Sequence, residues 1–298
     1  MGVSKMNHRE ISIFTKDETS VNILTENELE TRYKKYKAVV EELTIMDDIF
    51  MRNVLKEQEC TEYILQVIME RKDLKVKEQV IQKDYKNLQG RSAILDCVAR
   101  DSEETIYNIE IQQAREGTSP KRARYHSALL DMNTLEAGQD YNQLPENYVI
   151  FITRSDALGH SQPIYHVERR IREAKEDFKD GTHIIYVNAE KQEDTELGRL
   201  IHDLHCKHAD DMYSEVLARR VRELKETQKG VEGMSITIED IYQEGVEIGE
   251  KSGELKAKKE TALSFAKMGL SVEQIAEGLK ENVKVIEEWI SEGVTVSQ

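Results

Sequence analysis

The clearest pattern in the chain is an alternation of apolar and polar side chains in two segments joined by a polar turn. Ala93–Arg100 and Thr105–Gln113 alternate with the period of two that a β-strand imposes. Asp101–Glu104 between them is acidic and contains no large apolar residue. We therefore expect a β-hairpin over these residues.

Two carboxylates of this hairpin are expected to lie side by side. Ile109 and Ile111 share the face of the second strand that can meet a core, which leaves Glu110 and Gln112 together on the other face. A hairpin brings Asp96 beside Glu110, and adjacent carboxylates repel each other unless a proton or cation lies between them. Hard divalent cations such as Mg²⁺ prefer such oxygen ligands. On spacing alone a solvated strand face is the simpler interpretation, but the apolar neighbours of both residues favour a site.

Apolar periodicity predicts further elements on both sides of the hairpin. They are expected in this order: helices at 26–41, after Asp47 or Asp48, and at 59–71; a strand at 74–83; the hairpin; a helix from Pro120 to about Ala137; strands at 147–154 and 163–167; a short helix at 171–178; a strand at 182–188; and helices between 193 and 226. This order predicts an α/β fold in which a mixed central sheet is flanked by helices.

The pattern changes near residue 229. The next thirty or so residues are polar with recurring glycines, and we expect a weakly helical linker there. An apolar pattern returns with Ser271 and Gln274 placed as a capping box, followed by a last helix that carries Trp289 and Ile290. The expected parts are therefore an N-terminal arm and helix (1–42), a main domain (43–228), a polar linker (229–259) and a small helical unit (260–298).

The C-terminal helical unit has two interpretations. Its helix-turn-helix pattern is found in proteins that bind DNA. The last helix, however, has Glu287 and Glu288 against the single Lys284, and phosphate would repel such a face. We favour protein contacts, with Trp289 and Ile290 as anchors of a homo-oligomer.

Composition narrows the class of protein. The 298 residues include 33% charged residues and three widely spaced cysteines, and the net charge is −15. The cysteines are typical of reduced thiols, and neither a signal peptide nor an apolar run of membrane length is evident, so we expect a cytoplasmic protein without membrane contact. The acidic balance argues against non-specific nucleic-acid binding, although a local basic patch can still form.

Basic residues cluster just after the second hairpin strand. Lys121, Arg122 and Arg124 begin a predicted helix and are followed by Tyr125. Contact with phosphate from the start of a helix and a plain solvated helix face explain this cluster equally well. His202, His205, Cys206 and His208 have spacing that suggests zinc, but they lie in one predicted helix without a second ligand pair, so we expect packed and solvent-facing side chains there.

Several segments together resemble one known family. They are TIMDDIFMRNVL at 44–55, ILDCVARDSEETIYNIEIQ at 94–112, PKRARYHSALLDMNTLEAGQDYNQLPENYVIFIT at 120–153 and HDLHCKHADDMYSEVLARRVRELKETQKGVEGM at 202–234. In order and spacing these resemble the PD-(D/E)XK nuclease family of transposase-like proteins, also called recombination-promoting nucleases. The resemblance implies a restriction-endonuclease-like core of α-β-β-β-α-β type. It also implies Mg²⁺-dependent hydrolysis of DNA, with Mn²⁺ as a substitute, in a protein linked to mobile elements or recombination.

The resemblance also implies roles for individual residues. Asp96 corresponds to the central metal-binding aspartate and Glu110 to the second metal carboxylate. The backbone carbonyl of Ile111 is a candidate third ligand. Asp48, with Asp47 beside it, corresponds best to the aspartate of the first helix, which completes the metal site or its water shell.

The chain departs from the family pattern close to the predicted metal site. Gln112 takes the place of the usual lysine, Ile94 stands where an arginine is common, and His126 stands where a second tyrosine is common. A neutral glutamine can orient water or donate to phosphate, so more of the positive charge must come from the metal or from Arg122 and Arg124. A non-catalytic regulator that binds DNA or protein on a nuclease scaffold is the alternative.

Overall fold

The computed structural model describes residues 26–85, 92–113 and 115–295. The expectation of a loose arm over residues 1–25 lies outside this range. Contacts divide the chain into two compact units, residues 1–235 and 236–298. Within the described part of the chain, no helix combines the length and the apolar character needed to cross a bilayer.

Helices come first in the larger unit, as the periodicity predicts. They are α1 (Glu26–Glu42), α2 (Asp48–Val54) and α3 (Gln58–Ile68). The apolar side chains of Phe50, Val54 and Leu55, in and directly after the second helix, are fully buried.

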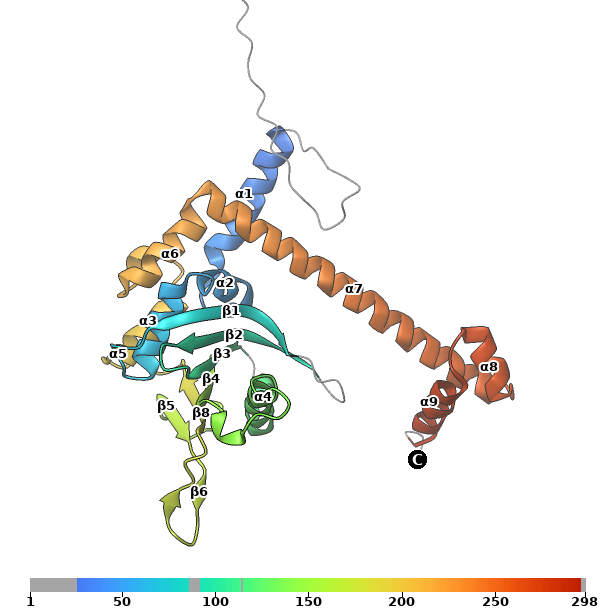
Figure 1. The fold of residues 1–298 in the computed structure, drawn as a ribbon. Coiled ribbons are helices and arrows are strands. Elements are labelled where there is room, and N and C mark those ends of the chain that lie inside the picture. The colour runs from blue at the N-terminus through green and yellow to red at the C-terminus, as the bar shows by residue number, and fades with distance from the viewer. Residues whose placement is uncertain (1–25, 86–91, 114, 296–298) are drawn as a thin grey trace, which may run out of the picture. The chain divides into compact units, whose positions relative to one another are not determined.

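A six-stranded mixed sheet forms the centre of the larger unit (Figure 1). Its spatial order is β1 (Val76–Tyr85), β2 (Ala93–Asp101), β3 (Ile106–Gln112), β4 (Asn147–Thr153), β8 (Thr182–Asn188) and β5 (Ile164–Val167). The first three strands are antiparallel neighbours, β3, β4 and β8 run parallel, and β5 closes the far edge antiparallel to β8. The predicted α/β class and the predicted hairpin are both confirmed.

Helices cover both faces of this sheet (Figure 1). On one face α4 (Pro120–Met132) packs over Val149, Phe151 and Tyr186 through its buried Ala123 and Leu130. The alternate residues of β4 and β8, among them Ile150, Ile152 and Val187, are equally buried on the opposite face. On that side α2, α3, α5 (Glu196–His205) and α6 (Glu215–Glu226) pack together. Burial on both faces makes the middle strands apolar along nearly their whole length.

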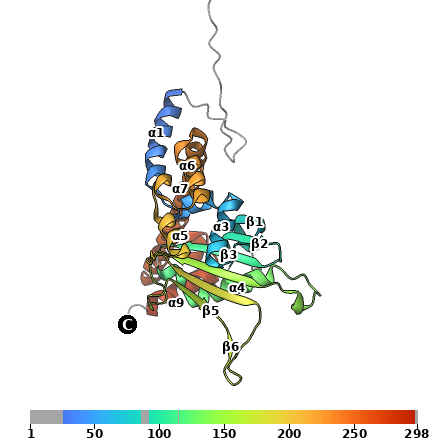
Figure 2. The same ribbon diagram turned by 90° about the vertical axis from the view of Figure 1, so that its left-hand side faces the viewer.

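The segment predicted as a short helix at 171–178 is instead a β-hairpin, so that prediction was wrong. It consists of β6 (Arg170–Ile171) and β7 (Glu176–Asp177), which extend away from the main sheet (Figures 1 and 2). All its residues are exposed, so an isolated helix there would have no surface on which to bury an apolar stripe. Lys175, with φ of 59°, forms the turn.

The segment expected to be a polar linker lies within a continuous helix, α7 (Gln228–Lys267). Glutamate and lysine have high helix propensity, and pairs such as Glu254–Lys258 (3.0 Å) add support between successive turns. The glycines lower the stability of this helix without ending it. Gly269, with φ of 89°, follows where the helix stops.

The smaller unit has its own apolar core. The capping box predicted at Ser271 and Gln274 is present at the start of α8 (Val272–Leu279), which precedes α9 (Val283–Thr295). Trp289 is only 7% exposed and packs with Ala262, Ile275, Ala276 and Ile286. The side chain expected to anchor contacts between copies is therefore used inside the unit.

Short 3-10 turns complete the secondary structure: η1 (Arg115–Thr118), η2 (Tyr141–Gln143) and η3 (Ala209–Asp211).

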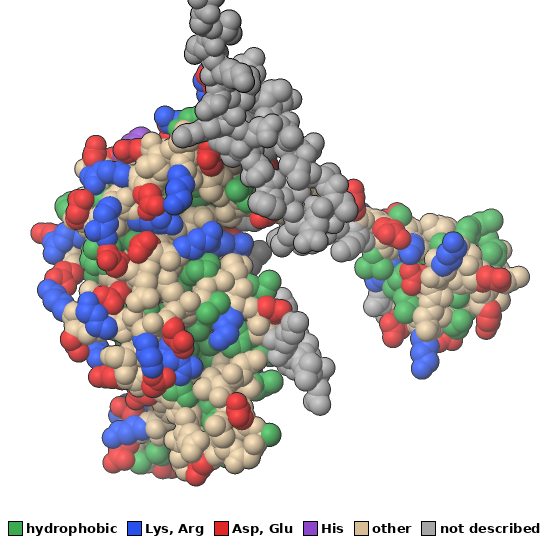
Figure 3. All heavy atoms as spheres, turned by 45° about the horizontal axis from the view of Figure 1, so that its top comes forward, with side chains coloured by type: hydrophobic (Ala, Val, Ile, Leu, Met, Phe, Trp, Pro, Cys, Tyr) green, Lys and Arg blue, Asp and Glu red, His purple; other side chains and the backbone are tan. Residues whose placement is uncertain are grey.

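Acidic and basic side chains are interspersed over the face of the larger unit seen in Figure 3. Cations therefore remain available on this surface despite the negative net charge.

Candidate active site

The two carboxylates predicted to meet do lie together, on β2 and β3. The backbone N–H of Asp96 donates to Oε1 of Glu110 at 3.3 Å. Glu110 is fully buried and Asp96 is partly buried. A solvated strand face is therefore excluded, because β3 is buried from Ile106 through Ile111.

Burial and mutual repulsion disfavour ionisation of this pair. Burial raises the pKa of Glu110, and the charge of Asp96 raises it further. Burial also raises the pKa of Asp96, and the nearby carboxylate of Asp48 adds to that effect. Asp96 thus lies under the influence of carboxylates from β3 and α2, an arrangement that a cation would stabilise.

Asp48 and Asp47, which the sequence left as alternatives, have different surroundings. Asp48 begins α2, and Arg52 donates to both of its oxygens, Nε to Oδ1 at 2.9 Å and Nη2 to Oδ2 at 2.6 Å. Asp47 instead accepts from the backbone N–H of Thr44 at 2.7 Å and from Nε2 of Gln113 at 2.6 Å. Burial alone would raise the pKa of Asp47, but these hydrogen bonds lower it. Asp47 therefore fixes the turn before α2.

Arg122 and His126 of α4 hold the buried glutamate. Nη2 of Arg122 donates to Oε2 of Glu110 at 3.1 Å, and Nδ1 of His126 lies 3.5 Å from Oε1. Nε of Arg122 also donates to Nε2 of His126 at 3.3 Å. Burial and the charge of Arg122 lower the pKa of His126 to about 4. Glu110 therefore faces one permanent cation and one imidazole that is neutral at neutral pH.

Gln112 and Arg122 meet at a glycine. A Cβ on Gly117 would lie 2.1 Å from Oε1 of Gln112 and 3.3 Å from Nη1 of Arg122. Nη1 of Arg122 also donates to the carbonyl of Gly117 at 3.1 Å. A larger residue here would force the end of the Gln112 side chain to move. The close approach places the amide of Gln112 next to the guanidinium of Arg122.

Gln82 of β1 contacts Asp96, and nothing in the sequence indicated this contact. Its Nε2 donates to Oδ1 of Asp96 at 3.1 Å, and its φ is 55° within a strand. A left-handed backbone costs a non-glycine residue about 1–2 kcal/mol. The alternation of β1 gives no signal for either feature, because both depend on the pairing with β2.

A comparison with models of known protein families identifies the family of this chain. The model described as PD-(D/E)XK nuclease family transposase matches residues 49–206. The chain belongs to this family. The match includes Asp96, Glu110 and Arg122, and Asp48 immediately precedes it. No curated protein and no solved structure matched the chain.

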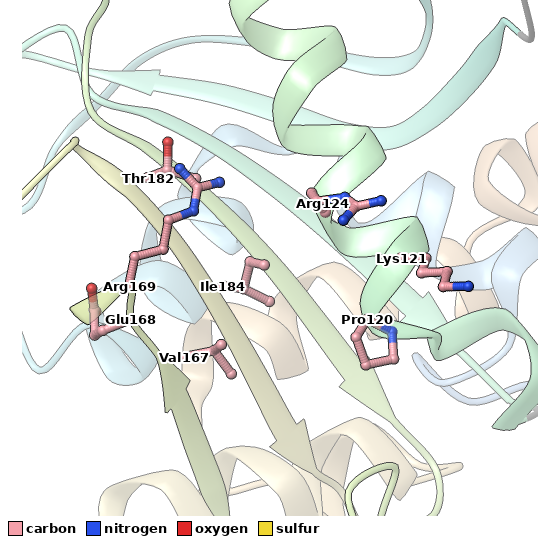
Figure 4. A pocket seen from close by; sticks show the side chains of 8 residues that line it. All are labelled: Pro120, Lys121, Arg124, Val167, Glu168, Arg169, Thr182 and Ile184. Atoms are coloured by element: carbon pink, nitrogen blue, oxygen red, sulfur yellow. The ribbon is translucent and has the colours of Figure 1, made fainter. Parts of the chain in front are cut away.

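The residues expected to bind DNA divide between two sides of α4 in this PD-(D/E)XK protein. Arg122 reaches the carboxylates, whereas the exposed Lys121 and Arg124 line a separate pocket beside β5 and β8 (Figure 4). Tyr125 is partly buried and packs against the core under α4. Among these four residues, Arg122 is therefore the one placed beside Glu110.

The histidine-rich segment packs as expected. His202, Asp203 and Cys206 have side-chain atoms within 4.8 Å of one another. The oxygens of Asp203, however, accept the backbone N–H groups of Tyr213 and Ser214, both at 2.8 Å. These hydrogen bonds give Asp203 a structural role in fixing the turn before α6.

Proposed function

We propose that this protein is a metal-dependent DNA endonuclease that hydrolyses phosphodiester bonds and serves mobile elements or DNA recombination. The observation that carries the proposal is the pair of adjacent carboxylates, Asp96 and the fully buried Glu110, on neighbouring strands. Membership in the PD-(D/E)XK nuclease family transposases supports the class of reaction.

The donor set fits a divalent cation. The groups that converge are carboxylates with raised pKa values, and Mg²⁺ and Mn²⁺ both accept such oxygen ligands. Asp96, Glu110 and the carbonyl of Ile111 would hold the ion, and Asp48 would act on its water shell. A bound ion of this kind polarises a phosphate oxygen and lowers the pKa of a bound water.

The chain's own residues supply orientation and fixed charge. Arg122 forms an ion pair with Glu110 at 3.1 Å, and it would face the charge that develops on the phosphate. Gln112 is neutral and half-buried beside Gly117, where its amide would orient a water or donate to phosphate. In this arrangement Arg122 takes over the electrostatic role that a strand lysine has in other family members.

Nicking of supercoiled plasmid with Mg²⁺ or Mn²⁺ tests the proposal. We expect cleavage by the unmodified protein and only background cleavage by Asp96→Ala and Glu110→Ala. Glu190→Ala, which removes an exposed carboxylate outside the site, is the control and should cleave normally. Metal-dependent cleavage by both purified site variants at the normal rate would reject the metal-site assignment.

A non-catalytic regulator that binds DNA or protein is the second candidate. It is favoured by the Arg122–Glu110 ion pair, which balances one buried carboxylate without a metal, and by Gln112 in place of lysine. Calorimetric titration with Mg²⁺ and Mn²⁺ separates the two candidates. A folded protein that binds neither ion at millimolar concentration would favour the regulator.

A further inference from the structure

A second feature of α4 lies on the side away from the carboxylates. A pocket of about 280 Å³ lies between the start of α4 and the sheet edge (Figure 4). Pro120, Lys121 and Arg124 line it from the helix, and Val167, Arg169 and Ile184 line it from β5, the residues after it, and β8. Its floor is apolar, whereas three of its lining side chains are cations.

Two of these cations are available to a ligand. The carboxylate of Glu168 lies 3.0 Å from Nδ1 of His183, and Arg169 forms an ion pair with Asp180. Both pocket residues therefore already have partners. Lys121 and Arg124 are exposed and make no ion pair with another residue that the structure describes. They are three positions apart and therefore lie on one face of the helix. The partly positive N-terminus of α4, capped by Ser119, adds to the local field.

The floor of the pocket selects among anionic ligands. Val167 is 41% exposed although it belongs to a strand, and Pro120 is also exposed. Nucleic-acid strands combine a negative backbone with flat apolar bases, and proteins bind unpaired strands with cations for the backbone and side chains, usually aromatic, that contact the base faces. In this pocket the contact with the base would come from aliphatic side chains. In a duplex the base faces are already stacked, so a duplex would leave this floor uncovered.

We propose that this pocket binds an unpaired nucleotide of the DNA substrate, with its phosphate at Lys121 and Arg124 and its base over Val167 and Ile184. The inference rests on the proposed nuclease function. Arg122 lies between Lys121 and Arg124 in sequence and reaches Glu110 on the other side of the helix. One helical turn thus links the carboxylates to the pocket, and the substrate class becomes DNA with a single-stranded segment.

Fluorescence anisotropy with the full chain in EDTA tests the pocket without cleavage. The probes are a single-stranded oligonucleotide, a blunt duplex, and the duplex with an unpaired extension. We expect tighter binding to the first and third probes. The double variant Lys121→Ala/Arg124→Ala should weaken that binding about tenfold or more. It should also reduce the slope of log K against log salt by about 0.7, as expected for one lost phosphate contact on a single strand.

Two further variants separate the floor from general charge. Val167→Asn, which makes the floor polar without adding charge, should weaken binding of the unpaired probes and leave duplex binding unchanged. Lys229→Ala, which removes an exposed lysine outside the pocket, is the control and should bind normally. Equal affinity for all three probes, or unchanged affinity and salt slope in the double variant, would overturn the proposal.

Failure of the pocket proposal can be distinguished from failure of the nuclease proposal. Pocket-dependent binding of unpaired DNA without cleavage in any metal would support the pocket and reject the enzyme. Metal-dependent cleavage whose substrate binding is unaffected by Lys121→Ala/Arg124→Ala would support the enzyme and reject the pocket.

Discussion

Gln82 donates a hydrogen bond to the carboxylate of Asp96 from a strand position whose backbone is left-handed. A left-handed non-glycine residue in contact with a predicted metal ligand suggests that the conformation is retained because it positions that ligand. In metal sites, partners that orient a ligating group typically contribute 10–100-fold to metal affinity.

Replacing Gln82 separates this positioning role from a structural one. We expect Gln82→Gly and Gln82→Ala each to weaken Mn²⁺ binding about tenfold or more in calorimetry, because both lose the hydrogen bond. Gln82→Gly should nevertheless be about 1 kcal/mol more stable to denaturant than Gln82→Ala, because glycine adopts the left-handed backbone without strain. If both variants bound Mn²⁺ like the unmodified protein, Gln82 would have no role in positioning Asp96.

The raised pKa of Glu110 predicts a pH dependence of stability in EDTA. An acid whose pKa is raised by folding leaves stability intact below its ordinary pKa and lowers it as pH rises through the raised value. We therefore expect the unfolding free energy to fall between about pH 5 and about pH 9, and to fall less in Glu110→Gln. Denaturant titrations across this range provide the measurement. Glu190→Gln is the control, and identical profiles for Glu110→Gln and the unmodified protein would contradict the prediction.

The contact between Gln112 and Gly117 predicts a suppressible defect. Gly117→Ala places a methyl group 2.1 Å from the present position of Oε1 of Gln112, so the amide must move and disturb Arg122. Overpacking of this kind typically costs about 1–3 kcal/mol. Adding Gln112→Ala should restore much of the lost stability in a double-mutant cycle. Additive losses would mean that the two side chains do not collide.

Truncation tests the organisation of the two units. A chain ending at Ser235 retains the whole sheet and its covering helices, so we expect cooperative unfolding like that of the full chain. If the C-terminal helices mediate self-association, light scattering should report fewer subunits per particle after truncation. An unchanged number of subunits would exclude that role. If truncation does lower the number of subunits, exposed apolar residues such as Met268, 74% exposed, are candidates for the contact, because Trp289 is buried within the unit.

Local patterns predicted the parts of this fold that local forces determine. The alternation through Asp96 and Glu110 identified both strands, although Glu110 was expected to face away from the core and is instead buried. The capping box at Ser271 could likewise be predicted, because it lies within four consecutive residues. Such features need no knowledge of the distant chain.

Features that depend on distant residues were not accessible in this way. Gln82 reaches Asp96 only because β1 pairs with β2, and Arg122 reaches Glu110 only because α4 packs over β3. The hairpin at 170–177 was misread as a helix because its sparse apolar residues fit either period, and only the lack of a neighbouring surface distinguishes them. The residues of the cluster at 121–125 were correctly placed on a helix, but their division between two sides of it required the sheet.

The placement of Arg122 has a consequence for control of the site. In a motif with the lysine on the glutamate's own strand, cation and carboxylate form one rigid body. Here Asp96 and Glu110 belong to the sheet and the guanidinium of Arg122 belongs to α4. A small displacement of that helix would alter the electrostatic potential at the carboxylates while the sheet keeps its register. A ligand that contacts Lys121 or Arg124 would therefore act on the same helix that holds Arg122 against the proposed metal site.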